Sequence, residues 1–431
     1  MRVMKWSMIA LAVSASTSQF AMASSQEESK GFLEDQSLTV KSRLLYMNRD
    51  FKNGASNNQG TPNKPDRSNG YREETGLGVQ AVYESGFTQG TVGFGLDALA
   101  NGMVKLDSGA GRTGNGMFGK DSEGHPEDTQ SNVGGAVKFR VSDTVLKYGN
   151  QYVASPVFST DDSRLLPEVA TGTLITSKEI KGLELSAGRF TSMRAQNQMG
   201  RDSLDVTDGF RPGLKSADIA GATYQFTDNF VAGVAASDVE DFFKKQYVNA
   251  NYTLPISDDQ SLNFDFNGYR TKSQGQELSG NVDNRIWSLA AAYSIGAHKF
   301  TVAHQRSSGD SGYVYGIDGG GTIFLANSVQ YSDFNGEDER SWQARYDLNM
   351  KSYGIPGLSF MTRYIRGDNI TTGDTESKEH EWDFETKYVL QSGPAKDLSF
   401  RVRNAVYRAN SDYDTDKVDT RLIIEYPLSI L

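Results

Sequence analysis

The chain of 431 residues has no cysteine, only 10 prolines and no long hydrophobic run after its N-terminal segment. The absence of cysteine excludes disulfides and thiolate metal sites, and it is typical of exported chains that avoid thiols. The absence of any run of about 18 apolar residues excludes a transmembrane helix. A hydrophobic fraction of 37% is also low for a chain that must bury the cores of several soluble domains.

Glycine and aromatic residues are abundant by contrast, with 44 glycines, 20 tyrosines and 22 phenylalanines. Acidic residues outnumber basic ones by 54 to 44, which gives a formal net charge of −10. This composition argues against two or three soluble domains. The negative charge leads us to expect no nucleic-acid partner.

The N-terminus has the three parts of a secretory signal peptide in the required order. Arg2 and Lys5 supply positive charge, residues 8–13 form a short apolar stretch, and residues 21–23 read AMA, a small-residue cleavage site. We expect cleavage behind this site, so that residues 1–23 are removed. Because no cysteine follows, the mature chain has no position for a lipid anchor.

Alternation of apolar and polar residues with a period of two dominates the rest of the chain. In SLNFDFNGY, for example, Leu262, Phe264 and Phe266 alternate with asparagine and aspartate residues. This is the pattern of a strand with one apolar face, and no segment of comparable length has helical periodicity. We predict eighteen strands, at 37–51, 71–85, 88–97, 132–141, 144–153, 170–178, 183–190, 216–226, 229–238, 243–254, 261–270, 283–294, 298–306, 340–351, 357–366, 380–390, 398–408 and 416–430.

The connections between these strands alternate in length. Short turns such as 142–143 are separated by mostly long polar loops such as 98–131, 307–339 and 367–379. An outer-membrane barrel has this asymmetry, with tight periplasmic turns and long external loops, and its closure leaves no exposed sheet edge in lipid. We therefore predict an all-β fold in which residues 24–431 form one 18-stranded antiparallel transmembrane β-barrel in the outer membrane of a Gram-negative bacterium.

The polarity of the two strand faces supports a lipid-facing exterior and a wet interior. One parity carries tyrosine, phenylalanine and tryptophan, as a lipid-facing band requires, while the other is polar and charged. In LSFRVRNAVYRAN, Phe400 and Val402 belong to the lipid face, so Arg401 and Arg403 face the lumen. The same assignment predicts a basic inner wall made of Lys41, Arg43, Arg49, Lys138, Arg140, Arg345, Arg363, Arg401, Arg403 and Arg421.

Barrel closure would place the last strand beside the first, which gathers most of these basic residues on adjacent strands. Lys138 and Arg140 lie on the strand at 132–141, across the barrel from that group. Arginine keeps its charge and binds carboxylates bidentately, so a column of arginines offers an anion successive weak sites rather than one trap. The other interpretation is that each is a wall charge paired with a neighbouring carboxylate. The inward-facing acids are Asp265, Asp347, Asp383, Glu385, Asp419 and Glu425.

Two further arginines do not fit the inner wall. Arg189 shares the parity of Leu183 and Leu185, so it requires a bulge or a strand end and is left unassigned. Arg408 has the parity of the lipid face and is expected at the outer rim.

Several long stretches resemble the OprD-type outer-membrane carboxylate channels, a family of substrate-specific porins. They include SLTVKSRLLYMNRDF near the start, SGFTQGTVGFGLDALA, DDSRLLPE, TSKEIKGLELSAGRFT and NSVQYSDFNGEDERSWQARYDLNM, and together they span the mature chain. The resemblance implies an 18-stranded channel for small water-soluble compounds that usually carry a carboxylate. It further implies that the loop at 155–171 folds inward as a constriction and that the loop at 307–339 narrows the eyelet.

The resemblance also assigns roles to single residues. Arg43, Arg49, Arg140, Arg401 and Arg403 match the basic ladder of the family, while Arg164 is either a loop anchor or an eyelet residue. The constriction loops contribute the following candidates: Asp161, Asp162, Ser163, Arg164, Asp318 and Ser328. The chain ends in Leu431 rather than in the commoner terminal phenylalanine, as members of this family often do.

We expect no cofactor and no bound metal. The stretch GIDGGG at 316–321 lacks the strand and helix of a phosphate-binding loop and is interpreted as a flexible loop. His125, His298, His304 and His380 lack metal-ligand spacing. The acidic segments at 334–340 and 367–375 leave open a weak divalent-cation site at the cell surface.

The leading hypothesis is passive uptake of small carboxylates along the basic wall, by a protein that is not an enzyme. The loop sequence YGIDGGGTIFLANS resembles the branch of the family that takes cyclic or aromatic carboxylates, rather than the branch for basic amino acids and peptides. A weakly anion-selective general porin, an outer-membrane lipase or protease and a surface adhesin are the alternatives. The expected partners are small carboxylate substrates, outer-membrane lipid and lipopolysaccharide, with the chain a monomer or a loose homo-oligomer.

Overall fold

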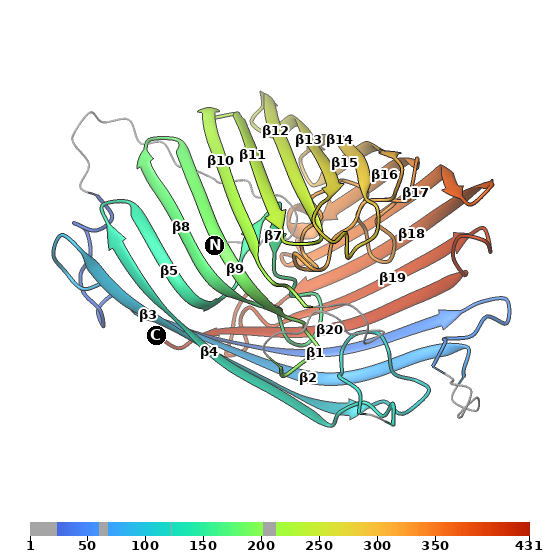
Figure 1. The fold of residues 1–431 in the computed structure, drawn as a ribbon, viewed down its shortest axis with the longest axis horizontal. Coiled ribbons are helices and arrows are strands. Elements are labelled where there is room, and N and C mark those ends of the chain that lie inside the picture. The colour runs from blue at the N-terminus through green and yellow to red at the C-terminus, as the bar shows by residue number, and fades with distance from the viewer. Residues whose placement is uncertain (1–23, 60–67, 122, 201–212) are drawn as a thin grey trace.

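The computed structural model describes residues 24–59, 68–121, 123–200 and 213–431. The predicted signal peptide lies outside these residues. The described strands form one antiparallel 18-stranded sheet that closes on itself, because β1 (Ser37–Phe51) pairs with both β2 (Tyr71–Glu84) and β20 (Lys417–Ser429). In Figure 1 the blue N-terminal strands therefore lie beside the red C-terminal ones. The predicted transmembrane barrel is confirmed.

The remaining barrel strands follow one another around the sheet, each pairing with its neighbour in sequence. They are β3 (Gly93–Asp107), β4 (Thr129–Val141), β5 (Thr144–Gln151), β8 (Val169–Ile180), β9 (Leu183–Arg194), β10 (Ala217–Thr227), β11 (Phe230–Val239), β12 (Phe243–Ser257), β13 (Gln260–Ser273), β14 (Asp283–Ile295), β15 (His298–Gly309), β16 (Arg340–Asn349), β17 (Leu358–Thr372), β18 (Thr375–Val389) and β19 (Ser399–Ala409). Between β5 and β8 a small hairpin, β6 (Ala154–Ser155) and β7 (Phe158–Ser159), stands apart from the barrel sheet.

All eighteen predicted strands are present, most with ends within four residues of the predicted bounds, and two regions differ by more. The strand predicted at 88–97 is β3, which begins at Gly93 and continues to Asp107, so part of the expected loop 98–131 is strand. Small residues weaken the alternation there, while hydrogen bonding to β2 extends the strand. The expected long loop 367–379 is also wrong, because β17 and β18 run on to a two-residue turn at 373–374.

The outward parity is apolar along the strands, as predicted. Phe400, Val402, Trp342 and Leu422 are exposed on the outer face, whereas Arg401, Arg403 and Arg421 point to the opposite side. An apolar outer face surrounding a polar interior is stable only where lipid surrounds the barrel. Within the described residues the one helical element is a 3-10 turn, η2 (Met350–Tyr353), and no helix there has the length and apolarity to cross a membrane.

Long loops at one end of the barrel fold inward and supply the buried apolar clusters. Val157 and Phe158 pack against Phe190 and Met193 of β9. On the opposite wall the cluster contains Leu45, Met47, Met103, Met117, Phe118, Leu165 and Leu166. A third cluster joins Tyr313 and Leu325 of the loop 310–339 to strands β13 and β14. In Figure 1 this loop, which connects β15 to β16, lies within the ring of strands. The interior is thus narrowed by packed loops.

Candidate functional site

The first inward loop, residues 152–168, is held to both sides of the barrel by apolar contacts. Phe158 stacks on Phe190 at 4.4 Å between ring centroids, and both side chains are fully buried. Farther along, Leu165 is fully buried beside Leu45 and Met47 of β1. A segment fixed in this way extends through the interior from β9 to β1. That it forms the constriction is a prediction from the family resemblance.

Asp162 fastens the middle of this loop to the basic wall. Its carboxylate forms ion pairs with Lys41 and with Arg43 Nη1, the latter at 3.0 Å, and accepts a hydrogen bond from Gln80 Nε2 at 2.9 Å. Burial alone would raise the pKa of Asp162, but the charges of Arg43 and Lys41 outweigh burial and lower it. Arg43 also pairs with Glu425 at 2.7 Å. Lys41 and Arg43 therefore anchor the constriction loop.

The second inward loop, residues 310–339, is held by a fully buried ion pair. Lys245 Nζ of β12 lies 2.6 Å from Asp318 Oδ2, and neither side chain is exposed. Lys245 also donates to the carbonyl of Val314 at 3.1 Å and lies over the ring of Tyr313. Burial raises the pKa of Asp318, which the lysine opposes. Asp318 belongs to the constriction loop as expected, but it anchors that loop away from the lumen surface.

The glycine-rich stretch 316–321 is tightly packed against the first loop, which contradicts its interpretation as a flexible loop. A Cβ on Gly319 would lie 2.0 Å from the carbonyl oxygen of Ser159, and the backbone there has φ +97°. Ser159 N donates to Asp318 O at 3.1 Å, and Gly321 N donates to Ser159 O at 3.1 Å. Glycine is required because the two backbones touch.

Glu168 joins the two loops with one carboxylate oxygen. Its Oε2 accepts hydrogen bonds from Asp161 N at 2.8 Å and from Gly320 N at 2.9 Å. Burial, with repulsion from Asp161, raises the pKa of Glu168 to about 8. Beside it Asp161 accepts hydrogen bonds from Ser163, and Ser328 Oγ donates to Asp333 Oδ1 at 2.5 Å. The candidates Asp161, Ser163 and Ser328 thus form hydrogen bonds to other residues of the two loops.

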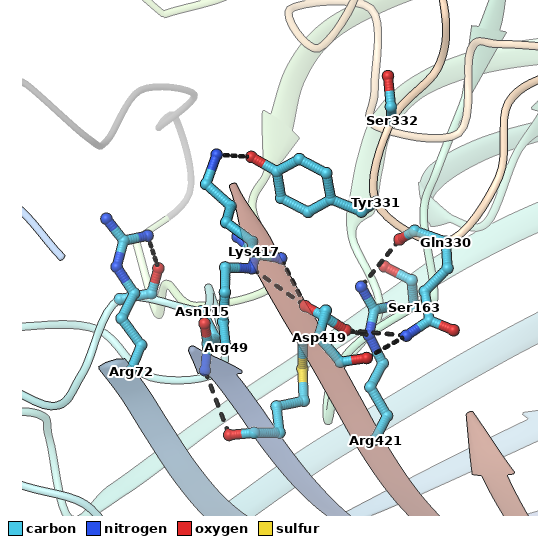
Figure 2. Close-up of polar contacts among 12 residues, drawn as sticks. Arg49, Arg72, Asn115, Ser163, Gln330, Tyr331, Ser332, Lys417, Asp419 and Arg421 are labelled. Atoms are coloured by element: carbon cyan, nitrogen blue, oxygen red, sulfur yellow. Dashed lines mark hydrogen bonds and ion pairs between the residues drawn. The ribbon is translucent and has the colours of Figure 1, made fainter. Parts of the chain in front are cut away.

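Figure 2 shows where these loops meet the basic wall. Arg49 Nη2 lies 2.9 Å from Asp419 Oδ2, and Arg421 Nε lies 2.6 Å from Asp419 Oδ1, so one carboxylate serves two arginines. Gln330 of the second loop donates from its side-chain Nε2 to Asp419 Oδ1 at 3.0 Å. Its backbone carbonyl oxygen accepts a hydrogen bond from Arg421 Nη2 at 2.9 Å. Tyr331, next in the chain, lies over the guanidinium of Arg49 at 4.8 Å.

Arg164 brings a further positive charge to this place from the first loop. It donates from Nε to Asn115 O at 2.8 Å and from Nη1 to Ser163 Oγ at 2.9 Å. No carboxylate among the described residues forms an ion pair with it. Burial and repulsion from Arg421 and Arg49 lower the pKa of Arg164 to about 10, so it remains cationic at neutral pH. Both roles considered from the sequence stay predictions. Its hydrogen bonds suit a loop anchor, and its charge without an ion pair suits an eyelet residue.

Arg401 and Arg403 continue the basic wall toward the other end. Both pair with a single carboxylate oxygen, Glu385 Oε2, which lies 2.6 Å from Arg401 Nη2 and 3.3 Å from Arg403 Nε. The contact of Arg403 Nε is not a hydrogen bond, and Arg401 Nε likewise has no hydrogen-bond acceptor. Arg403 lies directly opposite Arg421 in the strand register, and Arg345 lies opposite Arg363 in the same way. Like charges directly opposite are unfavourable in a sheet unless an anion compensates them. Arg345 and Arg363 have their own partners, Asp347 and Asp383.

Lys138 and Arg140 are separated from this group. Lys138 pairs with Asp97 at 2.6 Å, and Arg140 Nε donates to Gln26 Oε1 at 2.9 Å while its guanidinium lies over the ring of Phe87. These contacts lie at the end of the barrel with the two-residue turn 142–143. Together with the N-terminal segment the two residues line a cavity of about 410 Å³. They therefore stand at the periplasmic mouth rather than at the constriction.

Three residues of the eyelet region were not among the predicted candidates: Arg72, Lys417 and Tyr331. Lys417 donates to the Tyr331 hydroxyl and pairs with Asp414 at 2.5 Å; Arg72 donates to the carbonyls of Asn57 and Gly114. Lys417 begins β20 and has the same inward parity as Arg421. Applying the parity rule to the first residues of that strand would have included it in the predicted basic wall. Among the described residues, no group of three or more histidine, aspartate or glutamate side chains is arranged to hold a metal ion.

A closed barrel of this size, apolar outside and narrowed by inward loops along an arginine-rich wall, defines a membrane channel of the outer-membrane type. The model of the OprD family, described as outer membrane porins, matches residues 30–430. The chain belongs to this family of substrate-specific outer-membrane channels, which are channels rather than enzymes, and it is a multi-pass protein of a Gram-negative outer membrane.

Similar proteins agree with this assignment over the full length. Porin D of Pseudomonas aeruginosa is 48% identical over 458 residues, covering 100% of each chain. The crystal structure of Acinetobacter baumannii OccAB1 has a TM-score of 0.87 at 33% identity, covering 95% of this chain and 100% of that one. The structure of Pseudomonas aeruginosa OpdK with vanillate has a TM-score of 0.80 at 32% identity, covering 93% and 100%.

Proposed function

We propose that the protein is a selective channel for the passive uptake of small water-soluble carboxylates. In this proposal the substrate carboxylate moves along Arg403, Arg421 and Arg49 and passes Arg164 at the constriction. The wall supplies charge and geometry, and no energy coupling is involved. Several comparable arginines in sequence allow entry and exit, which a single deep site would prevent.

The observation that carries the proposal is the shortage of carboxylates around these arginines. Asp419 is shared by Arg49 and Arg421, and Glu385 is shared by Arg401 and Arg403. Arg164 adds a fifth cation that forms no ion pair among the described residues. By contrast, Arg363 has a carboxylate of its own, Asp383, at 2.6 Å. The excess of positive charge at the constriction favours an anionic substrate group.

Cyclic or aromatic carboxylates are the class that we favour within this proposal. The loop sequence at 315–328 resembles the branch of the family that takes this class. In addition, Tyr331 presents an aromatic ring beside Arg49 at the constriction. The similarity to OpdK, whose structure contains vanillate, an aromatic carboxylate, supports the same class.

A second candidate is a channel for basic amino acids or peptides, and the acidic side of the constriction favours it. Asp161 lies partly exposed on the same loop as Arg164, close enough for their charges to interact. Asp161 also influences Asp333 and Glu168, so acidic groups gather on that side. A molecule with a carboxylate at one end and a cation at the other would match both sides.

The test is single-channel current in planar bilayers with benzoate, gluconate, citrate and arginine added in turn. We expect concentration-dependent block by benzoate in the natural protein, weakened about tenfold or more in the double variant R401A/R403A. The variant E385Q removes the carboxylate that the two arginines share, so block should become stronger. Arg189→Ala, an arginine exposed on the outer face, is the matched control.

The outcomes separate the candidates. Block by arginine but not by benzoate would replace the favoured class with basic amino acids. Current that is indifferent to every solute and unchanged in both lumen variants would contradict selective uptake, leaving a general porin with a structural charge network.

A further inference from the structure

The outer face of the barrel carries a row of basic residues that the channel function does not use. We name it the outer basic row: Arg285, Arg306, Arg340, Arg366, Lys378, His380 and Arg408. Six consecutive strands, β14 to β19, contribute these residues. All share the parity of the exposed apolar side chains, so they point away from the lumen.

Strand register brings members of the row close together. Arg306 lies directly opposite Arg340, and His380 lies directly opposite both Arg366 and Arg408. Like charges in directly opposite positions are destabilising in an antiparallel sheet, and Asp368, opposite Arg340 on its other side, offsets part of this repulsion. Anions from outside the chain would offset the positive charge that remains, above all around Arg366 and Arg408.

The charges of the row are sparsely compensated by the protein. The side chains of Arg285, Arg306, Arg366 and Lys378 form no ion pair among the described residues, and Arg340 Nη2 donates only to the amide oxygen of Asn369, at 3.0 Å. Arg408 Nε lies 3.6 Å from Asp416 Oδ2, the one carboxylate paired with the row. Asp283, near Arg285, is occupied by Arg270 and Lys272. Asp368 lies directly opposite Arg340 in the register without forming an ion pair among the described residues, and Asp374 and Glu376 lie at the same end of β17 and β18.

The row lies just beyond a band of exposed aromatic residues. Trp342, Tyr364 and Trp382 are exposed on the same face, each two residues nearer the periplasmic end of its strand than Arg340, Arg366 and His380 respectively. Such aromatic bands mark the border of the hydrocarbon layer. The row is therefore at headgroup height, and it is on the external side, because the long loops extend from that end.

A hollow in the row gives a headgroup a place to bind. A cavity of about 380 Å³ is lined by Tyr364, Arg366, Lys378, His380 and Arg408, and also by the two acids Asp416 and Glu379. The Glu379 carboxylate accepts hydrogen bonds from Ser332 in the lumen and so is directed inward. Arginine and lysine converging on one hollow are suited to phosphate, which arginine binds bidentately.

We propose that the outer basic row is a binding site for the phosphate groups of a phosphorylated lipid of the external leaflet, seated at the hollow between Arg366 and Arg408. The row does not continue to β1 and β2, which follow β19 and β20 around the barrel. There the corresponding outward positions include Asp50, Tyr71 and Glu73, and Glu73 pairs with Arg112. The lipid is thus expected on one side of the barrel.

The test uses the full-length protein purified in detergent and titrated with diphosphorylated lipid A, observed by native mass spectrometry. The double variant R306Q/R366Q removes two side chains that have no protein partner, so the fold should be unaffected. We expect lipid binding to weaken roughly 25-fold, since each of the two basic residues contributes about fivefold at an anionic surface. Arg189→Gln, an outward arginine paired with Asp218 at 3.0 Å, should bind as the natural protein does.

Two further arms decide between sources of phosphate. Dephosphorylated lipid A should bind no better to the natural protein than to the double variant, and inorganic phosphate at millimolar concentration should not displace the diphosphorylated lipid. Equal binding of the phosphorylated lipid to natural protein and double variant would overturn the proposal. Displacement by inorganic phosphate would replace the lipid site with a site for free phosphate. Unchanged channel current in the double variant shows that the barrel is intact.

Discussion

At the scale of single residues, the constriction depends on side chains that serve the fold and the channel together. Asp162 illustrates this, because its pairs with Lys41 and Arg43 fix the loop and also reduce the free positive charge of the wall. Arg164 illustrates the opposite case, because its backbone-directed hydrogen bonds hold it in place without neutralising it. A basic residue that pairs with a carboxylate therefore anchors a loop, whereas one that bonds only to neutral groups keeps its charge available to a substrate.

Glu168 makes the constriction sensitive to pH. Its pKa is raised to about 8 in the folded protein, so between the ordinary glutamate pKa and pH 8 the folded state retains a proton that the unfolded state has lost. Its stabilising contribution is complete at low pH and is lost as the pH rises toward 8, on the order of a few kcal/mol. We expect current fluctuations from loop movement to increase several-fold between pH 6 and pH 9.

The variant E168Q provides the control for this prediction. Glutamine keeps a carbonyl oxygen that can accept from Asp161 N and Gly320 N but has no ionisable proton. Fluctuations that rise with pH equally in the natural protein and in E168Q would show that another group is responsible.

At the scale of elements, the two inward loops behave as parts of the barrel wall. The loop 310–339 is fixed by the buried pair of Lys245 and Asp318, and the loop 152–168 by its apolar contacts with β1 and β9. The strands around these loops could be predicted from the sequence, because the alternation of apolar and polar residues is a local property of each strand. They did not predict the loop packing, and the glycine-rich segment near Gly319 was wrongly interpreted as flexible.

Removal of one partner of the buried pair should loosen the second loop. In K245M the Asp318 carboxylate would be left buried without its cation, at a cost of about 3–5 kcal/mol. We expect larger and noisier single-channel current and faster proteolytic cleavage within 310–339, measured in proteoliposomes. The double variant K245M/D318N removes both charges and should restore most of the protection. Equal protease resistance in K245M and the natural protein would show that the pair does not hold the loop.

At the scale of the whole molecule, an acidic chain maintains a basic interior passage. The net charge of −10 includes the external loops, whereas we expect selectivity to depend on the charges at the constriction. There Arg49 and Arg421 share Asp419, and Arg164 is close enough for its charge to interact with both. The barrel keeps the charges that line the lumen apart from those elsewhere on the protein, because inward and outward residues alternate along every strand.

Selectivity that depends on charge must weaken in salt. The Debye length falls from about 10 Å at 0.1 M to about 3 Å at 1 M salt. We expect the anion preference of the channel, measured as zero-current potential across a potassium chloride gradient, to decrease several-fold over this range. An anion preference that stays constant with salt would indicate selection by the shape of the passage instead.

The sequence by itself determined the strands, their number, the closed barrel and the parity of the basic wall, because each follows from local alternation and from the requirements of lipid. Arg401, Arg403 and Arg421 could be placed in the lumen on these grounds. Only the tertiary structure decided which charges share partners. Asp419 meets Gln330 from a distant loop, Glu168 joins two loops, and Lys138 lies apart from the constriction. Such contacts depend on how long loops fold back into the lumen, which no periodicity along the chain records.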